Sequence, residues 1–142
     1  MKVTVVFTCF NRKNKTLDCV NRLIGGNPST EFQFVIVDDG STDNSPHIAQ
    51  DYCANHPECV FIAQPNQGVS SARNNAIRVA KGTYILPVDA DDKIADSFIQ
   101  KAVEVIENTD DVRVVGCRCW MFGGVNKEWE LPHFTHALLA RK

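Results

Sequence analysis

Short apolar runs alternate with stretches of helical spacing along most of the 142-residue chain. Runs of β-branched and aromatic residues that are apolar at nearly every position are typical of strands covered on both faces. They predict strands at Val3 to Phe7, Phe32 to Val37, Cys59 to Ala63 and Tyr84 to Val88. A fifth strand is predicted from Val112 to about Cys119.

Apolar residues at intervals of three and four predict a helix after each of the first four strands. The predicted helices cover about residues 17–24, 46–53, 69–80 and 95–107. Gly25 and Gly26 are expected to end the first helix, because glycine often follows the last helical residue. Ser45 is expected to cap the second, with Pro46 at its first helical position.

Strands and helices alternate through short loops, which predicts a doubly wound α/β fold with a mostly parallel sheet and helices on both faces. No repeat, low-complexity tract or linker interrupts the pattern, so a single domain over residues 1–142 is expected. The end of the chain fits this alternation less well. There Gly123 and Gly124 suggest a turn between two short strands, and Phe134 to Leu139 suggests a further helix.

The charge balance excludes some partners. With 15 Lys and Arg against 17 Asp and Glu, nothing electrostatic suggests a nucleic acid or an anionic membrane as an obligatory partner. No apolar run approaches the roughly 18 residues of a membrane span, and the chain opens directly into a strand rather than a signal peptide. We expect a cytoplasmic protein without a membrane span, with peripheral membrane association left open.

Six cysteines are present, without a C-x-x-C pair or the four grouped ligands of a zinc site. The first four lie within apolar helix or strand patterns, and Cys117 and Cys119 alternate along the fifth predicted strand. We expect buried, reduced thiols rather than disulfides, as in most cytosolic proteins.

Polar residues directly follow three of the predicted strands. Thr8 to Asn11 follows the first strand, Asp38 to Ser41 the second and Asp89 to Asp92 the fourth. Open α/β sheets bind ligands beyond the carboxyl ends of their strands. These three segments are therefore expected to converge on one edge of the sheet and to form a binding site.

Asp89 and Asp91 stand two positions apart in an extended segment, so their carboxylates can point to the same side. Together with Asp92 they concentrate negative charge that a bound cation would relieve. Mg²⁺ or Mn²⁺ is commonly shared between one or two carboxylates and the phosphates of a substrate. The alternative is that these acids cap the helix that begins near Ala95, because an isolated Asp-x-Asp is a weak signal.

Asp38 and Asp39 follow a largely apolar run, and Gly40 lets the chain turn where φ can be positive. A carboxylate there can accept a hydrogen bond from a nucleobase N–H or a ribose hydroxyl. The alternative is an Asx turn that leads into the next helix. Arg73 lies one turn into its helix, where its guanidinium suits a phosphate or a carboxylate unless it only faces solvent.

The segments VTVVFTCFNR, FVIVDDGSTDNS, NQGVSSARNNAI and GTYILPVDADD together resemble the nucleotide-sugar-binding half of family 2-type inverting glycosyltransferases, which have the Rossmann-like GT-A fold. The resemblance covers about residues 2 to 107 well. Four motifs in the right order are far more specific than any one of them. Phe7 and Phe10 depart from the proline and tyrosine that the family usually has at these positions.

The resemblance implies a site for a nucleotide-diphospho-sugar donor. Thr8 and Phe10, with the adjacent Asn11, would line the base pocket. Asp39 would form a hydrogen bond with the base, and Asp38 would assist it.

The resemblance also implies a divalent cation, Mg²⁺ or Mn²⁺, at the other end of the donor. Asp91 would hold the ion directly. Asp89, with the adjacent Ala90, would contact the ribose or the coordination shell of the metal. Arg73 would lie near the base or the diphosphate.

The implied reaction transfers a sugar to a hydroxyl of an acceptor glycan or lipid-linked sugar with inversion, in polysaccharide or glycoconjugate synthesis. A carboxylate base would deprotonate that hydroxyl. The family has its base well downstream in a Glu-Asp-type sequence, which we do not find. The base is therefore expected beyond residue 142, with the acceptor-side portion outside the chain, whether the chain is a fragment or naturally short.

A non-catalytic nucleotide-binding or interaction module is the main alternative to an enzyme. A phosphoaspartyl receiver or phosphatase fits less well, because Lys93 follows the acids immediately instead of following a late strand. A dinucleotide site or a P-loop is excluded, because neither G-x-G-x-x-G nor G-x-x-x-x-G-K-[ST] occurs.

Overall fold

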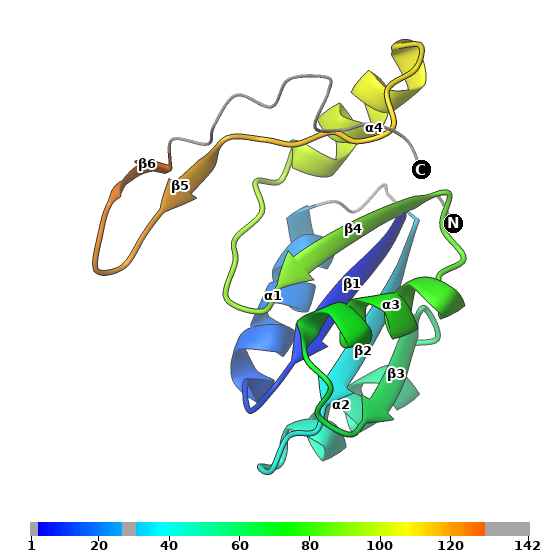
Figure 1. Cartoon of the computed structure of the whole chain (residues 1–142), viewed down its shortest axis with the longest axis vertical. Helices are drawn as coiled ribbons and strands as arrows, with labels where there is room; N and C mark the ends of the chain where they lie inside the picture. Colours follow the sequence, from blue (N-terminus) through cyan, green and yellow to red (C-terminus); the bar gives the residue numbers. More distant parts are fainter. Residues whose placement is uncertain (1–2, 27–30, 130–142) are drawn as a thin grey trace. The chain divides into compact units, whose positions relative to one another are not determined.

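The computed structural model describes residues 3–26 and 31–129. The chain groups into two compact units, residues 1–99 and residues 100–142. The first unit holds a parallel sheet with three helices, and the second holds most of a fourth helix and a β-hairpin (Figure 1). Organisation as a single domain stays a prediction, and the helix predicted at Phe134 to Leu139 lies outside the described residues.

The sheet of the first unit has parallel strands in the order β3-β2-β1-β4. They are β1 (Val3–Cys9), β2 (Phe32–Asp39), β3 (Cys59–Gln64) and β4 (Tyr84–Asp89). β1 and β2 lie at the centre and are buried along nearly their whole length, as their continuous apolar runs require. The predicted α/β fold with a mostly parallel sheet is confirmed.

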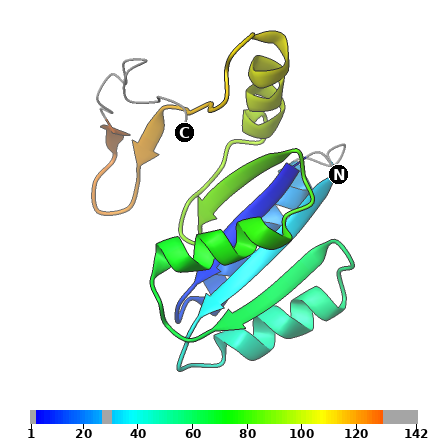
Figure 2. The ribbon, with the colours of Figure 1, turned by 45° about the vertical axis from the view of Figure 1, so that its right-hand side comes forward.

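Helices cover both faces of this sheet, as predicted. α3 (Val69–Val79) packs on one face against β1 and β2, whereas α1 (Lys13–Gly26) and α2 (Ser45–Ala54) lie together on the other face (Figure 2). α4 (Phe98–Asn108) begins later than predicted and belongs mainly to the second unit. None of the described helices has both the length and the apolar character that crossing a bilayer requires.

The start of α2 differs by one residue from the prediction. Ser45 is the first residue of the helix, and the cap position is Asn44. The carboxylate of Asp43 accepts a hydrogen bond from the Ser45 N–H at 2.8 Å and so satisfies an amide at the start of the helix. Three successive residues that can all cap a helix precede Pro46, so spacing alone did not identify the right one.

Side chains alternate between the two faces of the central strands. The core cluster on the α3 face consists of Val6, Val35, Val37, Ala72 and Ala76. The small side chains of α3 let this helix approach the sheet closely. The same alternation carries Thr8 and Asp39 to the α3 face at the strand ends, and it carries Asp38 to the opposite face.

A buried polar network ties the opposite end of the sheet together. The Thr4 hydroxyl donates to Gln33 Oε1 at 2.9 Å and accepts a hydrogen bond from the Gly82 N–H at 2.8 Å. Gln33 also accepts from the Lys81 N–H at 2.7 Å and donates to the Val79 carbonyl at 3.3 Å. The network therefore links β1 and β2 to the connection between α3 and β4.

The strand predicted from Val112 to Cys119 is wrong. In the second unit, β5 (Cys119–Met121) pairs antiparallel with β6 (Lys127–Trp129), and Gly123 adopts φ +99° in the turn between them. The predicted glycine turn between two short strands is thus confirmed. Val114 is 66% exposed, so its apolar run lacks the covering surface that a buried strand needs.

The expectation of buried, reduced thiols is wrong for one pair, which forms a disulfide, and for Cys117, which is exposed. Cys53, in the last turn of α2, forms a disulfide with Cys59 at the start of β3, and their Cα atoms are 4.8 Å apart. The tight turn between these elements brings the two residues together. Cys9 and Cys19 are free and buried, whereas Cys117 is free and exposed.

Candidate functional site

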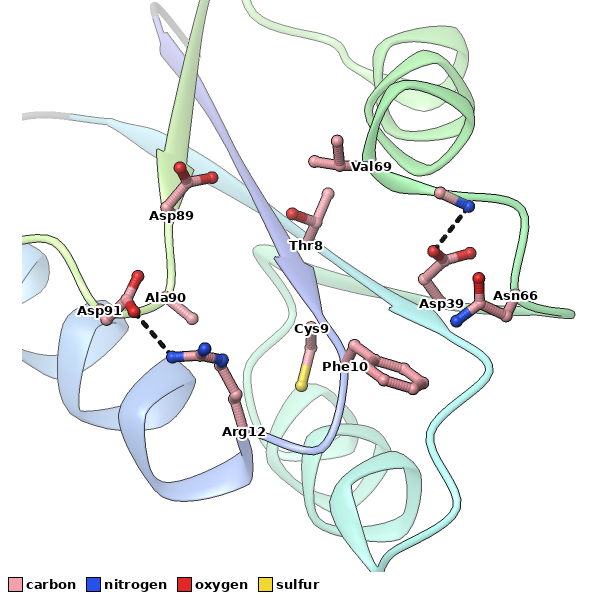
Figure 3. A pocket seen from close by; sticks show the side chains of 11 residues that line it. Thr8, Cys9, Phe10, Arg12, Asp39, Asn66, Val69, Asp89, Ala90 and Asp91 are labelled. Carbon is pink, nitrogen blue, oxygen red and sulfur yellow. Dashed lines mark hydrogen bonds and ion pairs between the residues drawn. The ribbon is translucent and has the colours of Figure 1, made fainter.

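The carboxyl ends of β1, β2 and β4 and the start of α3 open onto a cavity of about 370 Å³ (Figure 3). Its walls are formed by Thr8, Cys9, Phe10, Arg12, Asp39, Asn66, Gly68, Val69, Asp89, Ala90 and Asp91. Most of the predicted site residues are among them. The expected convergence of strand ends is therefore confirmed as geometry, while the binding roles of these residues stay predictions.

Asn11 does not line the cavity but joins two loops through hydrogen bonds. Its backbone has φ +53°, a left-handed conformation that asparagine tolerates better than most residues. Its N–H donates to Ser41 Oγ at 2.9 Å, and its Oδ1 accepts from the Thr42 N–H at 2.9 Å and from the Asp43 N–H at 3.3 Å. Asn11 thus connects the end of β1 to the loop that follows β2.

Asp39 lines the cavity and also holds the loop in front of α3. Its Oδ1 accepts hydrogen bonds from the Gln64 side chain and the Gln67 N–H, both at 2.8 Å. Its Oδ2 accepts from the Gly68 N–H at 2.9 Å (Figure 3). Each carboxylate oxygen has more than one lone pair, so Asp39 can hold this loop and still accept a hydrogen bond from a ligand.

Gly40 allows the loops after β2 and β3 to meet closely. It has φ +77°, and a Cβ at this position would lie 2.5 Å from the backbone nitrogen of Asn66, which lines the cavity.

Asp38 lies on the other side of the strand, where one carboxylate oxygen accepts from the Ser41 N–H at 2.9 Å. The other oxygen, Oδ1, is buried and has no hydrogen-bond partner among the described residues. Asp38 is not part of the cavity wall.

Asp89, the last residue of β4, and Asp91 are each paired with an arginine. Arg12 Nη1 lies 2.7 Å from Asp91 Oδ2, and Arg73 Nη2 lies 2.6 Å from Asp89 Oδ1. Arg73 itself does not line the cavity. Partial desolvation, followed by the carboxylates of Asp89 and Asp91, raises the pKa of Asp92. Three carboxylates therefore lie close together here, and two of them are balanced by arginines.

Among residues 3–26 and 31–129, no group of three or more His, Cys, Asp and Glu side chains is arranged to hold a metal ion. Asp89 and Asp91 nevertheless offer two carboxylates in one cavity wall. This donor set fits Mg²⁺ or Mn²⁺, which usually keeps several waters and is shared between one or two carboxylates and substrate phosphates. The residues present fit an ion that binds together with a phosphate-bearing ligand.

The sequence analysis did not single out Cys9, Arg12 or Val69, which also line the cavity. Arg12 could have been predicted as a site residue, because it is a cationic residue three positions after the end of β1, in the segment FNR. Its partner Asp91 is 79 residues away along the chain. Only the folded loops show that the two charges meet.

Comparison with known proteins identifies one family over nearly the whole chain. The sequence profile of Glycosyl transferase family 2 matches residues 4–141. The uncharacterized glycosyltransferase YibD of Escherichia coli (strain K12) is 34% identical over 130 residues, which are 91% of this chain and 37% of that protein.

Two solved structures share the fold. The mannosyltransferase PcManGT from Pyrobaculum calidifontis, in complex with GDP-Man and Mn²⁺, has a TM-score of 0.64 and 25% identity, over 72% of this chain and 31% of that chain. S. aureus TarS 1-349, in complex with UDP-GlcNAc, has a TM-score of 0.66 and 25% identity, over 82% of this chain and 37% of that chain. The chain thus spans about a third of the length of each of these three proteins.

Proposed function

The chain belongs to Glycosyl transferase family 2, and from this premise we propose that the cavity at the strand ends binds a nucleotide-diphospho-sugar for transfer of its sugar to an acceptor hydroxyl with inversion. The observation that carries the proposal is that carboxylates from separate segments, those of Asp39, Asp89 and Asp91, line one cavity. Asp39 stands across the cavity from the other two (Figure 3). This spacing suits a ligand with a hydrogen-bonding base at one end and a cation-bound diphosphate at the other.

The end of the cavity around Asp39 is the proposed base pocket. Thr8 and Phe10 line it with Asp39, and Phe10 is 47% exposed, so its ring is open to contact with a flat base. Asn11 and Asp38 support this pocket from behind through their hydrogen bonds to the loop after β2. They act on the nucleotide through the loop and not by direct contact.

The end around Asp91 is the proposed metal and diphosphate site. Asp91, together with Asp89, would hold Mg²⁺ or Mn²⁺, with the backbone of Ala90 between them in the wall. When bound, the ion neutralises charge that develops on the departing nucleoside diphosphate. Arg73 orients Asp89 through their ion pair and adds a positive charge beside the diphosphate. The complex of PcManGT with GDP-Man and Mn²⁺ supports this assignment.

Inversion follows when the acceptor oxygen attacks the anomeric carbon from the face opposite to the leaving group in a single displacement. A carboxylate base takes the proton of the acceptor hydroxyl. We assign no such base among the described residues, so transfer is proposed for the whole protein and donor binding for this chain. A glycan or lipid-linked sugar is the acceptor we expect, in polysaccharide or glycoconjugate synthesis. A cytoplasmic location stays a prediction.

A non-catalytic nucleotide-binding module is the second candidate. It is favoured because the described residues include side chains suited to the donor, whereas no catalytic base is assigned among them. The two candidates differ in one measurable respect, because only an enzyme releases free sugar or glycosylated acceptor from the donor. Assay of both products with Mn²⁺ and a panel of nucleotide sugars separates them.

Substitution of Asp91 tests the proposed function. We expect nucleoside diphosphates to bind in a metal-dependent manner, and we expect Asp91→Ala to weaken that binding more than tenfold, which is about 1.4 kcal/mol. The cause is loss of the carboxylate that holds the ion. Isothermal titration calorimetry with UDP, GDP and dTDP, with and without Mn²⁺, measures this effect.

Asp110→Ala is the matched control, because it removes an exposed carboxylate from the second unit. Its affinity for nucleoside diphosphates should equal that of the wild type. The same affinity in wild type and Asp91→Ala, or binding that does not depend on metal in either protein, would contradict the assigned metal role.

A further inference from the structure

The proposed metal-binding carboxylate already has a cationic partner that belongs to the protein. Arg12 lies in the loop between β1 and α1, and its Nη1 lies 2.7 Å from Asp91 Oδ2. Both side chains are about half exposed, at 49% each, and both line the cavity (Figure 3). The guanidinium therefore occupies one of the two Asp91 oxygens to which a divalent ion could bind.

A guanidinium and a divalent cation compete for one carboxylate oxygen. Arginine has only donors and stays protonated at any ordinary pH, so it cannot become a ligand of the ion. Two positive groups within a few ångströms also repel each other. Binding of the ion at Asp91 Oδ2 therefore requires that the Arg12 side chain leave this oxygen, and binding at Oδ1 is opposed by the guanidinium charge beside it.

The backbone of Arg12 is fixed, whereas its side chain can change partners. The Arg12 carbonyl accepts hydrogen bonds from the Thr16 N–H at 3.1 Å and from the Thr16 hydroxyl at 3.2 Å, in the first turn of α1. The half-exposed guanidinium has Asp91 as its ion-pair partner and faces the cavity. A rotation about the side-chain bonds is enough to move its charge.

Arg73 is less suited to such an exchange. It pairs with Asp89 from within α3, but it does not line the cavity. A phosphate in the cavity would meet Arg12 first. Planar guanidinium groups bind phosphate oxygens in a bidentate manner. When Arg12 leaves Asp91, the diphosphate therefore offers it another negatively charged partner.

We propose that Arg12 is a positioning residue that exchanges partners: it holds Asp91 when no divalent ion is present, and it turns to the diphosphate of the donor when the ion takes Asp91. This inference rests on the proposed function. Its consequence is coupling between the two ligands. The ion alone binds weakly, because it must displace Arg12, and the nucleotide stabilises the displaced side chain, so each ligand strengthens binding of the other.

Arg12→Gln tests the exchange through two effects of opposite sign. In the absence of nucleotide, the variant should bind Mn²⁺ about fivefold more tightly than the wild type, or better, because the competitor is gone. In saturating Mn²⁺, it should bind a nucleoside diphosphate about fivefold more weakly, or worse, because the phosphate contact is lost. Electron paramagnetic resonance of free Mn²⁺ measures the first constant, and calorimetry with UDP and GDP measures the second.

Lys15→Gln is the matched control, because it removes one positive charge from the first turn of α1 at an exposed position. Both constants should stay within about twofold of the wild type, since exposed charges at a distance are largely screened at ordinary salt. Arg12→Met keeps the aliphatic part of the side chain and should reproduce both effects of Arg12→Gln. Thermal unfolding of each variant confirms that it is folded.

The outcomes separate this inference from the proposed function. Equal Mn²⁺ affinity in wild type and Arg12→Gln, in proteins that bind Mn²⁺ and nucleotide, would overturn the exchange alone. Weaker binding of both ligands by the variant would also overturn it, because Arg12 would then only support the site. Absence of Mn²⁺ binding in both proteins, with and without nucleotide, would contradict the proposed function and this inference together.

Discussion

Asp39 shows how one residue can prepare a site and belong to it. Three hydrogen bonds, from the side chain of Gln64 and from the N–H groups of Gln67 and Gly68, fix its carboxylate. The same bonds hold the loop that leads into α3 in place. A ligand that reaches Asp39 therefore meets an acceptor whose position is already determined, and little ordering is needed when it binds.

Gly40 offers a test of this arrangement at the scale of one residue. We expect Gly40→Ala to destabilise the protein by about 1–3 kcal/mol, because alanine is strained at positive φ and its Cβ would lie 2.5 Å from the Asn66 nitrogen. It should also weaken nucleotide binding, since the loop with Asn66 must move. Urea unfolding and calorimetry measure the two effects.

Gly25→Ala is the control for that substitution. Gly25 has open space around its Cβ position and lies in the last turn of α1, so alanine there should be neutral or slightly stabilising. If both substitutions had the same small effect, the close approach of the loops after β2 and β3 would not matter for stability.

At the scale of elements, the position of β4 beside β1 depends on the buried network at the amino end of the sheet. Thr4→Val keeps the shape of the side chain but removes the hydroxyl that accepts from the Gly82 N–H and donates to Gln33. We expect a loss of about 1–3 kcal/mol, because polar groups in a buried site are left without a partner. Chemical denaturation of the variant measures it.

The exposed Thr83, in the same connection, is the matched control, and Thr83→Val should change stability by less than about 0.5 kcal/mol. Gly82 also approaches Thr4 so closely that a Cβ would lie 2.5 Å from the Thr4 nitrogen. A Thr4→Val protein as stable as the wild type would show that water replaces the lost hydrogen bonds at this position.

The elements that were predictable are those whose sequence pattern and packing agree. β1 and β2 are apolar on both faces in the sequence and are covered on both faces in the structure. The run from Val112 is also rich in valine, but it is mostly exposed, and residues 112–118 form no strand. The composition of a segment indicates its tendency to be buried. Whether it is buried depends on the elements that pack against it in the fold. The Cys53–Cys59 disulfide depends in the same way on how α2 and β3 meet.

At the scale of the whole molecule, topology made the acids of the site predictable, whereas Arg12 was not predicted. Parallel strands bring their carboxyl ends to one edge, so Asp39, Asp89 and Asp91 could be assigned to a common site without coordinates. The pairing of Arg12 with Asp91 depends on the path of two loops, for which the sequence has no periodic pattern. The hydrogen bonds of Asn11 were unpredictable for the same reason, whereas alternation along β2 already places the side chains of Asp38 and Asp39 on opposite faces.

The chain spans about a third of the relatives and solved structures that it matches. The described residues include the groups assigned to the proposed donor site. Transfer to an acceptor is a property proposed for the whole protein.

The most direct test of the proposed donor site is a crystal structure of the chain with Mn²⁺ and a nucleoside diphosphate, with anomalous diffraction recorded at the manganese edge. We expect an anomalous peak at the carboxylates of Asp89 and Asp91, the diphosphate beside it, Arg12 turned from Asp91 to the phosphate, and the base next to Asp39. A nucleotide bound elsewhere on the molecule, or manganese away from both carboxylates, would contradict the proposed site.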